Sequence, residues 1–159
     1  MELFHVISIT VPLLIAIGLP GLLNDKRATM RTNIAILYVA CILFFISWYL
    51  PSPLINGEDT SFVTHFIGGG LFSALLWWYI CRSRGMRFSW WRDVTLLFAL
   101  VSTLGVANEL FELILVQAGV ASILITDTSW DLVANTAGAM TGYVLYRLGE
   151  GALGYDSRH

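Results

Sequence analysis

Five long apolar stretches, separated by short polar breaks, constrain this chain more than any other feature of its sequence. They run at about 6–23, 33–50, 62–81, 94–117 and 130–148. Each is close to the ~20 residues that an α-helix needs to cross a hydrocarbon core about 30 Å thick. Strands are excluded because the stretches lack two-residue alternation and an open sheet would leave unpaired edges in lipid. The pattern predicts an all-α integral membrane bundle of five transmembrane helices, folded as one domain over residues 1–159.

The composition supports a lipid environment. Of the 159 residues, 57% are hydrophobic and only 13% are charged. A soluble domain has roughly a quarter of its residues charged. Most of the surface is therefore expected to contact membrane lipids rather than water.

Basic residues mark alternate loops, and this sets the expected orientation. The first and third loops are basic, with Lys26, Arg27 and Arg31, then Arg82, Arg84, Arg87 and Arg92. The second and fourth loops carry acids and no base, namely Glu58, Asp59 and Asp127. Because cytoplasmic loops are enriched in lysine and arginine, we predict an outside N-terminus and a cytoplasmic C-terminus. Nucleic-acid binding is not expected, since these basic residues belong to short loops that flank a membrane.

The fourth apolar stretch contains two glutamates. Ser102, Gly105, Glu109 and Glu112 follow one another at spacings of three, four and three, so they share one helical face. In the predicted orientation Glu112 lies roughly 7 Å below the outer end of its helix, and Glu109 lies one turn deeper. An acidic side chain near the bilayer centre costs about 2.5–3.5 kcal/mol, and such residues are usually functional.

Two other stretches bring polar residues to a similar depth. Asp131, Asn135, Gly138 and Gly142 share a face of the fifth helix, and His65 shares a face of the third helix with Gly69 and Ser73. Three helices are therefore expected to form one polar site in the outer leaflet.

Each polar residue also has a structural interpretation. Thr128 and Asp131 have the spacing of a capping box, and Asp127 could be a loop or N-cap residue. Asn135 could serve only as an interhelical hydrogen-bonding residue, and the glycines as packing surfaces. Either glutamate could stay protonated and hydrogen-bonded.

The same residues resemble the VanZ-like family of small bacterial membrane proteins. The likeness covers about Phe62–Leu148 and is carried by His65, Glu109, Glu112, Asp127, Asp131, Asn135, Gly138 and Gly142. Thr64 precedes His65 where the family usually has an Asp-Lys pair. The resemblance implies a bacterial cytoplasmic membrane location, and the family is named for low-level resistance to the glycopeptide teicoplanin.

Three functions remain open from the sequence. The first is a site for a lipid headgroup, a lipid-linked cell-wall precursor or glycopeptide, or a divalent cation, bound by His65, Glu109, Glu112, Asp127, Asp131 and Asn135. A divalent metal ion would be the cofactor, with His65, Glu109, Glu112 and Asp131 as candidate ligands. The second is an intramembrane hydrolase in which a glutamate is the base and His65 the acid, or a metal activates water. The third is a structural subunit that binds a membrane-protein partner.

Overall fold

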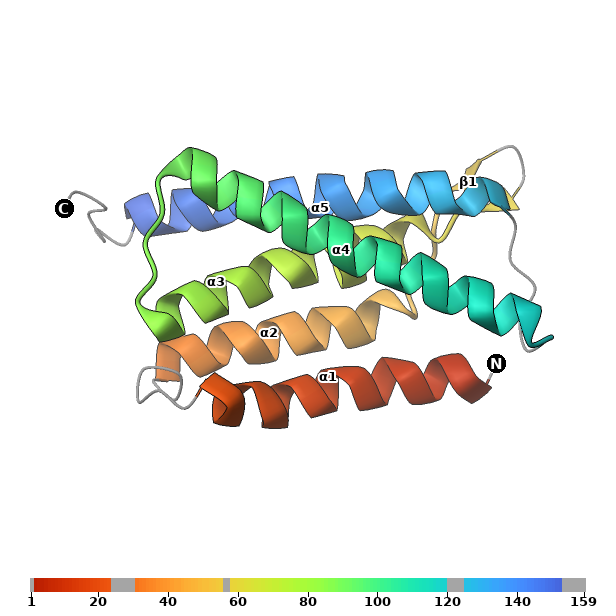
Figure 1. Cartoon of the computed structure of the whole chain (residues 1–159), viewed down its shortest axis with the longest axis horizontal. Helices are drawn as coiled ribbons and strands as arrows, with labels where there is room; N and C mark the ends of the chain where they lie inside the picture. The colour runs from red at the N-terminus through yellow and green to blue at the C-terminus, as the bar shows by residue number, and fades with distance from the viewer. Residues whose placement is uncertain (1, 24–30, 56–57, 120–124, 153–159) are drawn as a thin grey trace.

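The structure is a computed structural model that describes residues 2–23, 31–55, 58–119 and 125–152. In these ranges the protein is all-α, as predicted, with five helices and one short hairpin (Figure 1). The elements are α1 (Glu2–Leu23), α2 (Arg31–Ser47), β1 (Leu54–Ile55), β2 (Glu58–Asp59), η2 (Thr64–Leu71), α3 (Phe72–Arg84), α4 (Trp90–Gln117) and α5 (Ile125–Ala152). The π-helical η2 and the α-helical α3 are continuous and form the third helix.

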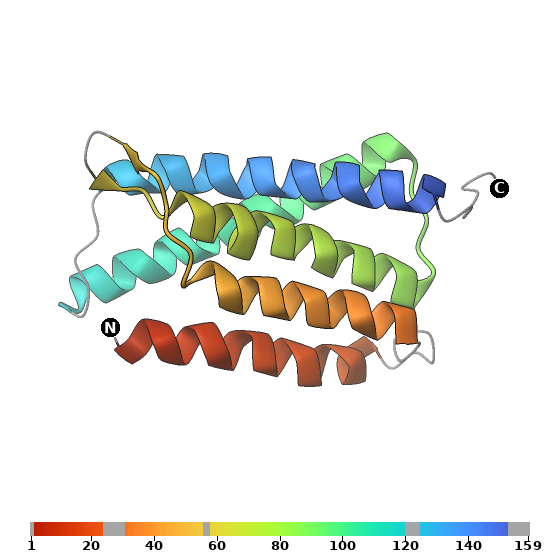
Figure 2. The same ribbon diagram turned by 180° about the vertical axis from the view of Figure 1, so that it is seen from behind.

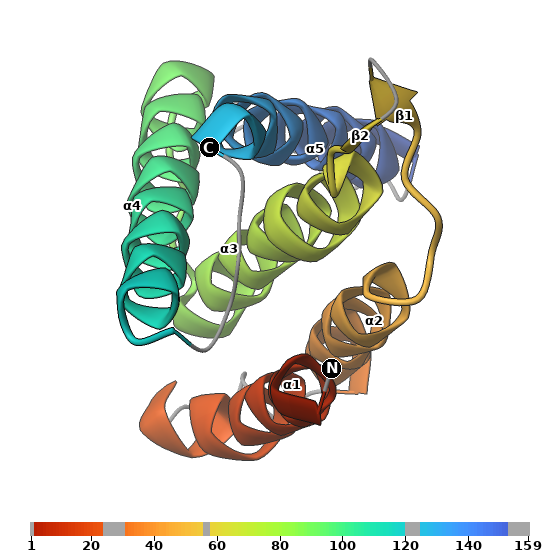
Figure 3. The same ribbon diagram turned by 90° about the vertical axis from the view of Figure 1, so that its right-hand side faces the viewer.

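The third helix occupies the centre of the bundle. Seen end-on, α4 and α5 lie on one side of it and α1 and α2 on the other (Figure 3). The segment α3 contacts all four other helices. No large hydrophobic side chain is exposed between residues 64 and 84, whereas α1, α2, α4 and α5 all carry exposed ones. Apolar side chains therefore cover the outside of the four peripheral helices as well as the core.

Two apolar clusters hold the third helix in place. One lies against α2 and is built by Leu23, Ile36, Leu37, Ala40, Cys41, Phe72, Leu76 and Tyr79. The other lies against α4 and α5 and is built by Ala74, Leu97, Val101, Ala139 and Tyr143. The two clusters contact opposite sides of α3, and this fixes the third helix within the bundle.

A seam of glycines brings the third helix very close to α5. A Cβ atom on Gly138 would collide with the carbonyl group of Phe66, and one on Gly70 would lie 2.7 Å from Gly138 Cα. A Cβ on Gly142 would lie 2.6 Å from that of Ala74. Small residues permit such close helix packing, as expected for a membrane bundle.

Several predicted helix ends differ from the structure. The predicted 33–50 helix spans Arg31–Ser47, because Pro51 disfavours helical backbone in the residue before it and the chain turns. The predicted 62–81 helix begins at Phe62 as predicted and ends later, at Arg84, and its segment Thr64–Leu71 is π-helical rather than α-helical. The predicted 6–23, 94–117 and 130–148 helices begin earlier, at Glu2, Trp90 and Ile125, and the last also ends later, at Ala152.

Within the part of the chain that the structure describes, two helices are long and apolar enough to cross a membrane, judged by length and composition. They are α1 over His5–Leu23 and α4. The helix α2 is apolar but shorter, at 17 residues.

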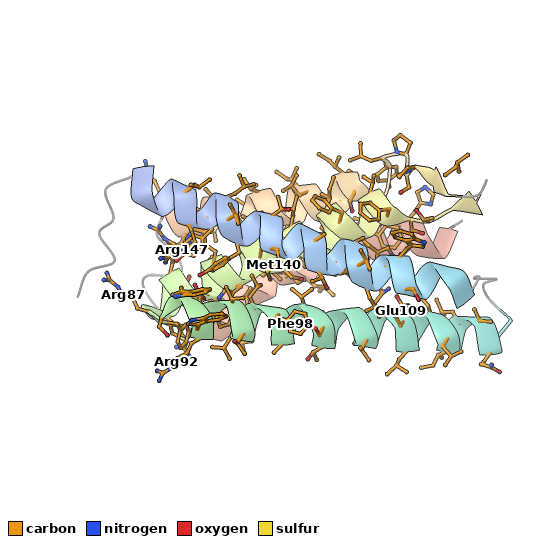
Figure 4. All side chains as sticks on the ribbon, turned by 90° about the horizontal axis from the view of Figure 1, so that it is seen from above. Arg87, Arg92, Phe98, Glu109, Met140 and Arg147 are labelled. Atoms are coloured by element: carbon orange, nitrogen blue, oxygen red, sulfur yellow. The ribbon has the colours of Figure 1, made fainter. Side chains whose placement is uncertain are left out.

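Several arginines gather at one end of the long axis of the bundle. Arg87, Arg92 and Arg147 lie at one end, and Glu109 lies in the opposite half (Figure 4). At the basic end Arg84 donates to the carbonyl of Leu23 at 2.9 Å. The C-terminal ends of α1 and α3 lie at this end, while β1 and β2 lie at the other (Figures 1 and 2).

Candidate functional site

The first half of the site joins the third helix to α5. His65 Nε2 lies 3.3 Å from Asp131 Oδ1, and Asn135 Nδ2 lies 3.5 Å from His65 Nδ1. Asp131 is 1% exposed and Asn135 is 5% exposed. Both nitrogens of the imidazole ring are therefore in contact with buried polar side chains of α5.

The second half is a group of three carboxylates. One oxygen each of Glu109, Glu112 and Asp131 lie within 4.8 Å of one another. Asn108 Nδ2 donates to Glu112 Oε1 at 2.7 Å, across one turn of α4. Glu109 Oε1 is buried and has no hydrogen-bond partner among the residues that the structure describes. Asp131 is common to both halves of the site.

Local packing fixes the position of Asn135. A Cβ on Gly69 would collide with Asn135 Oδ1, and one on Gly105 would lie 3.4 Å from Asn135 Nδ2. The amide of Asn135 is thus held between two glycines of different helices. Ser73 Oγ donates to the Gly69 carbonyl at 2.6 Å, which satisfies a backbone acceptor in the π-helical segment.

Five of the six predicted ligand residues come together in this way. His65 arrives from η2, Glu109 and Glu112 from α4, and Asp131 and Asn135 from α5. The sixth, Asp127, lies in the first turn of α5, and its side chain is outside the described residues.

The capping-box interpretation of Asp131 is wrong. It required the helix to start near Thr128, whereas α5 begins at Ile125 and Asp131 lies in its second turn. Asp131 is buried and paired with His65 instead.

The role of Asn108 was not predicted. Its signal in the sequence is its spacing of four residues from Glu112, which places the two side chains side by side on a helix. Asn108 lies toward the exposed edge of the group and holds one oxygen of Glu112.

The carboxylate spacing fits a single cation. Two oxygen ligands on opposite sides of a divalent cation, each about 2.1–2.4 Å from it, are at most ~4.8 Å apart. The three oxygens stay within that span, and Glu109 Oε1 is a buried acceptor that meets no donor in the described ranges. The donor set is all oxygen, which suits a hard cation such as Mg²⁺, Mn²⁺ or Ca²⁺.

His65 was a candidate metal ligand, but it lies beside the group of close ligand atoms and is not part of it. Its Nε2 faces Asp131, and the group of mutually close ligand atoms consists of carboxylate oxygens. In this geometry the histidine contacts a candidate ligand rather than completing the ligand group.

Comparisons with protein-family models, curated proteins and solved structures gave no match.

Proposed function

We propose that this chain is a five-span, VanZ-like protein of a bacterial cytoplasmic membrane whose site binds a divalent cation near the outer leaflet. Glu109, Glu112 and Asp131 hold the cation, and the cation in turn binds the phosphate of a lipid headgroup or lipid-linked precursor. The observation that carries the proposal is the convergence of three carboxylates within 4.8 Å. We include the resemblance to the VanZ-like family in this proposal, because the same carboxylates and their neighbours carry that resemblance.

Helix lengths support five crossings. The third helix has 8 residues in η2 and 13 in α3, and α5 has 28 residues. At 1.5 Å per residue the 17 residues of α2 extend about 26 Å, close to the ~30 Å of a hydrocarbon core. The exposed apolar side chains on all four peripheral helices suit lipid contact.

The electrostatics of the site favour a cation. Three carboxylates at this spacing repel one another, and the repulsion grows as the surroundings become less polar. A bound divalent ion removes that repulsion and supplies a partner for Glu109 Oε1. An acidic site would repel a bare phosphate, whereas a cation-filled site would attract one.

The orientation can be tested at the two ends of α4. Cysteines introduced at Ala118 and Ser89, which are both exposed, lie at the C-terminal and N-terminal ends of this helix. In intact cells an impermeant thiol reagent should label Ala118→Cys but not Ser89→Cys, which should react only after permeabilisation. The native cysteines are buried and give little background. The opposite labelling pattern would place the site in the cytoplasmic leaflet.

Cation binding can be tested with Mn²⁺. The purified protein in detergent should bind one Mn²⁺, seen as loss of the free-ion signal in electron paramagnetic resonance. The triple variant Glu109→Gln, Glu112→Gln, Asp131→Asn should lose at least tenfold in affinity. Asp93→Asn is the matched control, because Asp93 is a buried acid of α4 that accepts from Trp77 Nε1 at 2.6 Å in the other half of that helix. Equal Mn²⁺ binding by the triple variant and the control would reject the site.

A further inference from the structure

We propose that the corner between α3 and α4 binds the headgroup of an anionic phospholipid. The α3–α4 corner consists of five exposed residues, namely Arg84, Arg87, Trp90, Trp91 and Arg92. It lies at the arginine-rich end of the bundle, away from the half that holds Glu109 (Figure 4). The proposal requires that the chain crosses a membrane, but it does not require that the carboxylates bind a cation.

The backbone of the corner is held against α3. Gly85 has a φ of 65°, and the backbone N–H groups of Gly85 and Met86 donate to carbonyls in the last turn of α3. Beyond this turn the ring of Phe88 stacks on Trp77 of α3, with 5.9 Å between the ring centroids. The arginines of the corner are therefore carried by an ordered segment and need little backbone rearrangement to bind a ligand.

Within residues 82–93 the outward-facing charges are all positive. The single acid of this segment is Asp93. It is 6% exposed and accepts from Trp77 Nε1 at 2.6 Å, so its carboxylate is directed into the bundle. The three arginines of the corner are exposed instead, and Arg87 and Arg92 extend away from the helices (Figure 4). The outer surface of the corner therefore fits an anionic partner.

The aromatic residues of the corner favour a lipid over an acidic protein as that partner. Trp90 and Trp91 are 52% and 65% exposed, and their ring centroids lie 3.8 Å apart. Exposed indoles are typical of the membrane–water interface, because the ring is apolar and its N–H needs a polar partner. Further along α4 the surface continues with Leu96 and Phe98, which are also exposed. The basic groups thus adjoin an apolar surface that suits acyl chains.

The kind of basic residue favours a phosphate group. All four bases within residues 82–93 are arginines, and none is a lysine. A guanidinium group can donate two parallel hydrogen bonds to a phosphate, whereas an ammonium group acts as a point charge. A zwitterionic phospholipid also carries a phosphate, but its own cationic group offsets that charge. A phospholipid with a net negative charge should therefore bind better.

The test compares two lipids on the purified protein. Wild type in detergent with a chelator is mixed with equal amounts of phosphatidylglycerol and phosphatidylcholine that have the same acyl chains, and native mass spectrometry measures the bound lipids. One basic residue near a membrane surface strengthens the attraction of anionic lipid about fivefold, so phosphatidylglycerol should be retained at least about fivefold more. The chelator prevents cation-bridged binding at the carboxylates. Equal retention of the two lipids would overturn the proposal.

Two matched arginine variants test whether the corner is the binding surface. Arg92→Gln should lower the preference for phosphatidylglycerol about fivefold. Arg147→Gln removes the same charge from α5, outside the corner, and should leave the preference nearly unchanged. Both side chains are exposed, so both variants should fold as wild type does. An unchanged preference in Arg92→Gln, or an equal loss in both variants, would reject the corner.

An acidic protein partner would give another result. The probe is polyglutamate, added to the same detergent sample in place of lipid. A wild type that retains both lipids equally, but binds polyglutamate and loses it in Arg92→Gln, would show that the corner faces a protein. The lipid proposal would then be wrong.

The cation site and the α3–α4 corner fail separately. The triple variant Glu109→Gln, Glu112→Gln, Asp131→Asn should keep the preference for phosphatidylglycerol. If the wild type binds no Mn²⁺ but prefers phosphatidylglycerol, the cation site is wrong and the corner stands. If Mn²⁺ binds and the two lipids are retained equally, the corner is wrong and the cation site stands.

Discussion

Gly138→Ala is expected to lower the free energy of unfolding by about 3 kcal/mol, the upper end of the usual effect of overpacking. The added methyl group would meet the carbonyl group of Phe66, and a backbone group cannot rotate away as a side chain can. For a chain of 159 residues this corresponds to a fall in Tm of about 6–12 °C. Circular dichroism during heating in detergent measures it.

Gly70→Ala tests the same seam from the opposite side. Its methyl group would meet the carbonyl of Asn135, and would lie 2.7 Å from the amide nitrogen of Ala139. Gly18→Ala and Gly21→Ala are controls within α1, where the added methyl group meets no described residue within 4 Å. Alanine is the better helix former by about 1 kcal/mol, so the controls should not lose stability. Equal Tm values for Gly138→Ala and Gly18→Ala would show that α5 does not pack on the third helix in this way.

The convergence of polar residues from three helices could be predicted from two rules, helical spacing and the alternation of basic loops. Helical spacing put Glu109 and Glu112 on one face and Asp131 and Asn135 on another. The alternation of basic loops then put these faces at one depth. The structure confirms the shared face of α5, since Asp131, Asn135, Gly138 and Gly142 are all buried.

The helix ends were less predictable, because hydropathy locates apolar residues and not helical backbone. The α4 helix begins at Trp90, in a polar and aromatic segment that precedes the apolar stretch. The first residues of α5 include Asp127, Thr128 and Ser129, which suggest a cap or loop by composition. Their backbone is helical, so Asp131 lies in the second turn of α5 and not at its start.

The internal arrangement of the site could not be predicted from spacing alone. A π-helix has a wider turn than an α-helix, so η2 changes the rotation of His65 relative to α3. The position of Asn135 depends on the absence of a side chain at Gly69, because an added Cβ would collide with Asn135 Oδ1. Helical spacing puts Gly69 on the same face as His65, but it does not show that the amide of another helix lies against this glycine.

Glu112→Gln is expected to separate a functional carboxylate from a structural one. A glutamine has nearly the same shape, and its carbonyl oxygen can still accept from Asn108 Nδ2. Hydrogen bonds within membrane proteins average about 0.6 kcal/mol, so the Tm of the cation-free variant should stay within a few degrees of wild type. The neutral amide is a far weaker ligand for a divalent cation than the carboxylate.

The readout is the rise in Tm that the cation causes. At a cation concentration of 100 Kd, binding stabilises the folded state by about 2.7 kcal/mol. For a chain of this length the wild-type Tm should rise by about 5–10 °C, and the rise should vanish in Glu112→Gln. Thr103→Val is the control, because Thr103 is exposed and donates only to Ala99 O of its own helix, at 2.8 Å. It should keep the full rise.

The alternatives give patterns that differ from that of a cation site. If the glutamates only join helices as part of a larger membrane complex, wild type and Glu112→Gln should have similar Tm values with and without Mn²⁺. If Glu112→Gln unfolds in the absence of the cation, the carboxylate is structural and the cation site loses its main support. A hydrolase that uses Glu112 as a base without a metal would keep cation-free stability and show no Mn²⁺ effect in wild type. Only a cation site combines a stable Glu112→Gln variant with a wild-type Tm that depends on Mn²⁺, because only there does the charge of the carboxylate act through a bound ion.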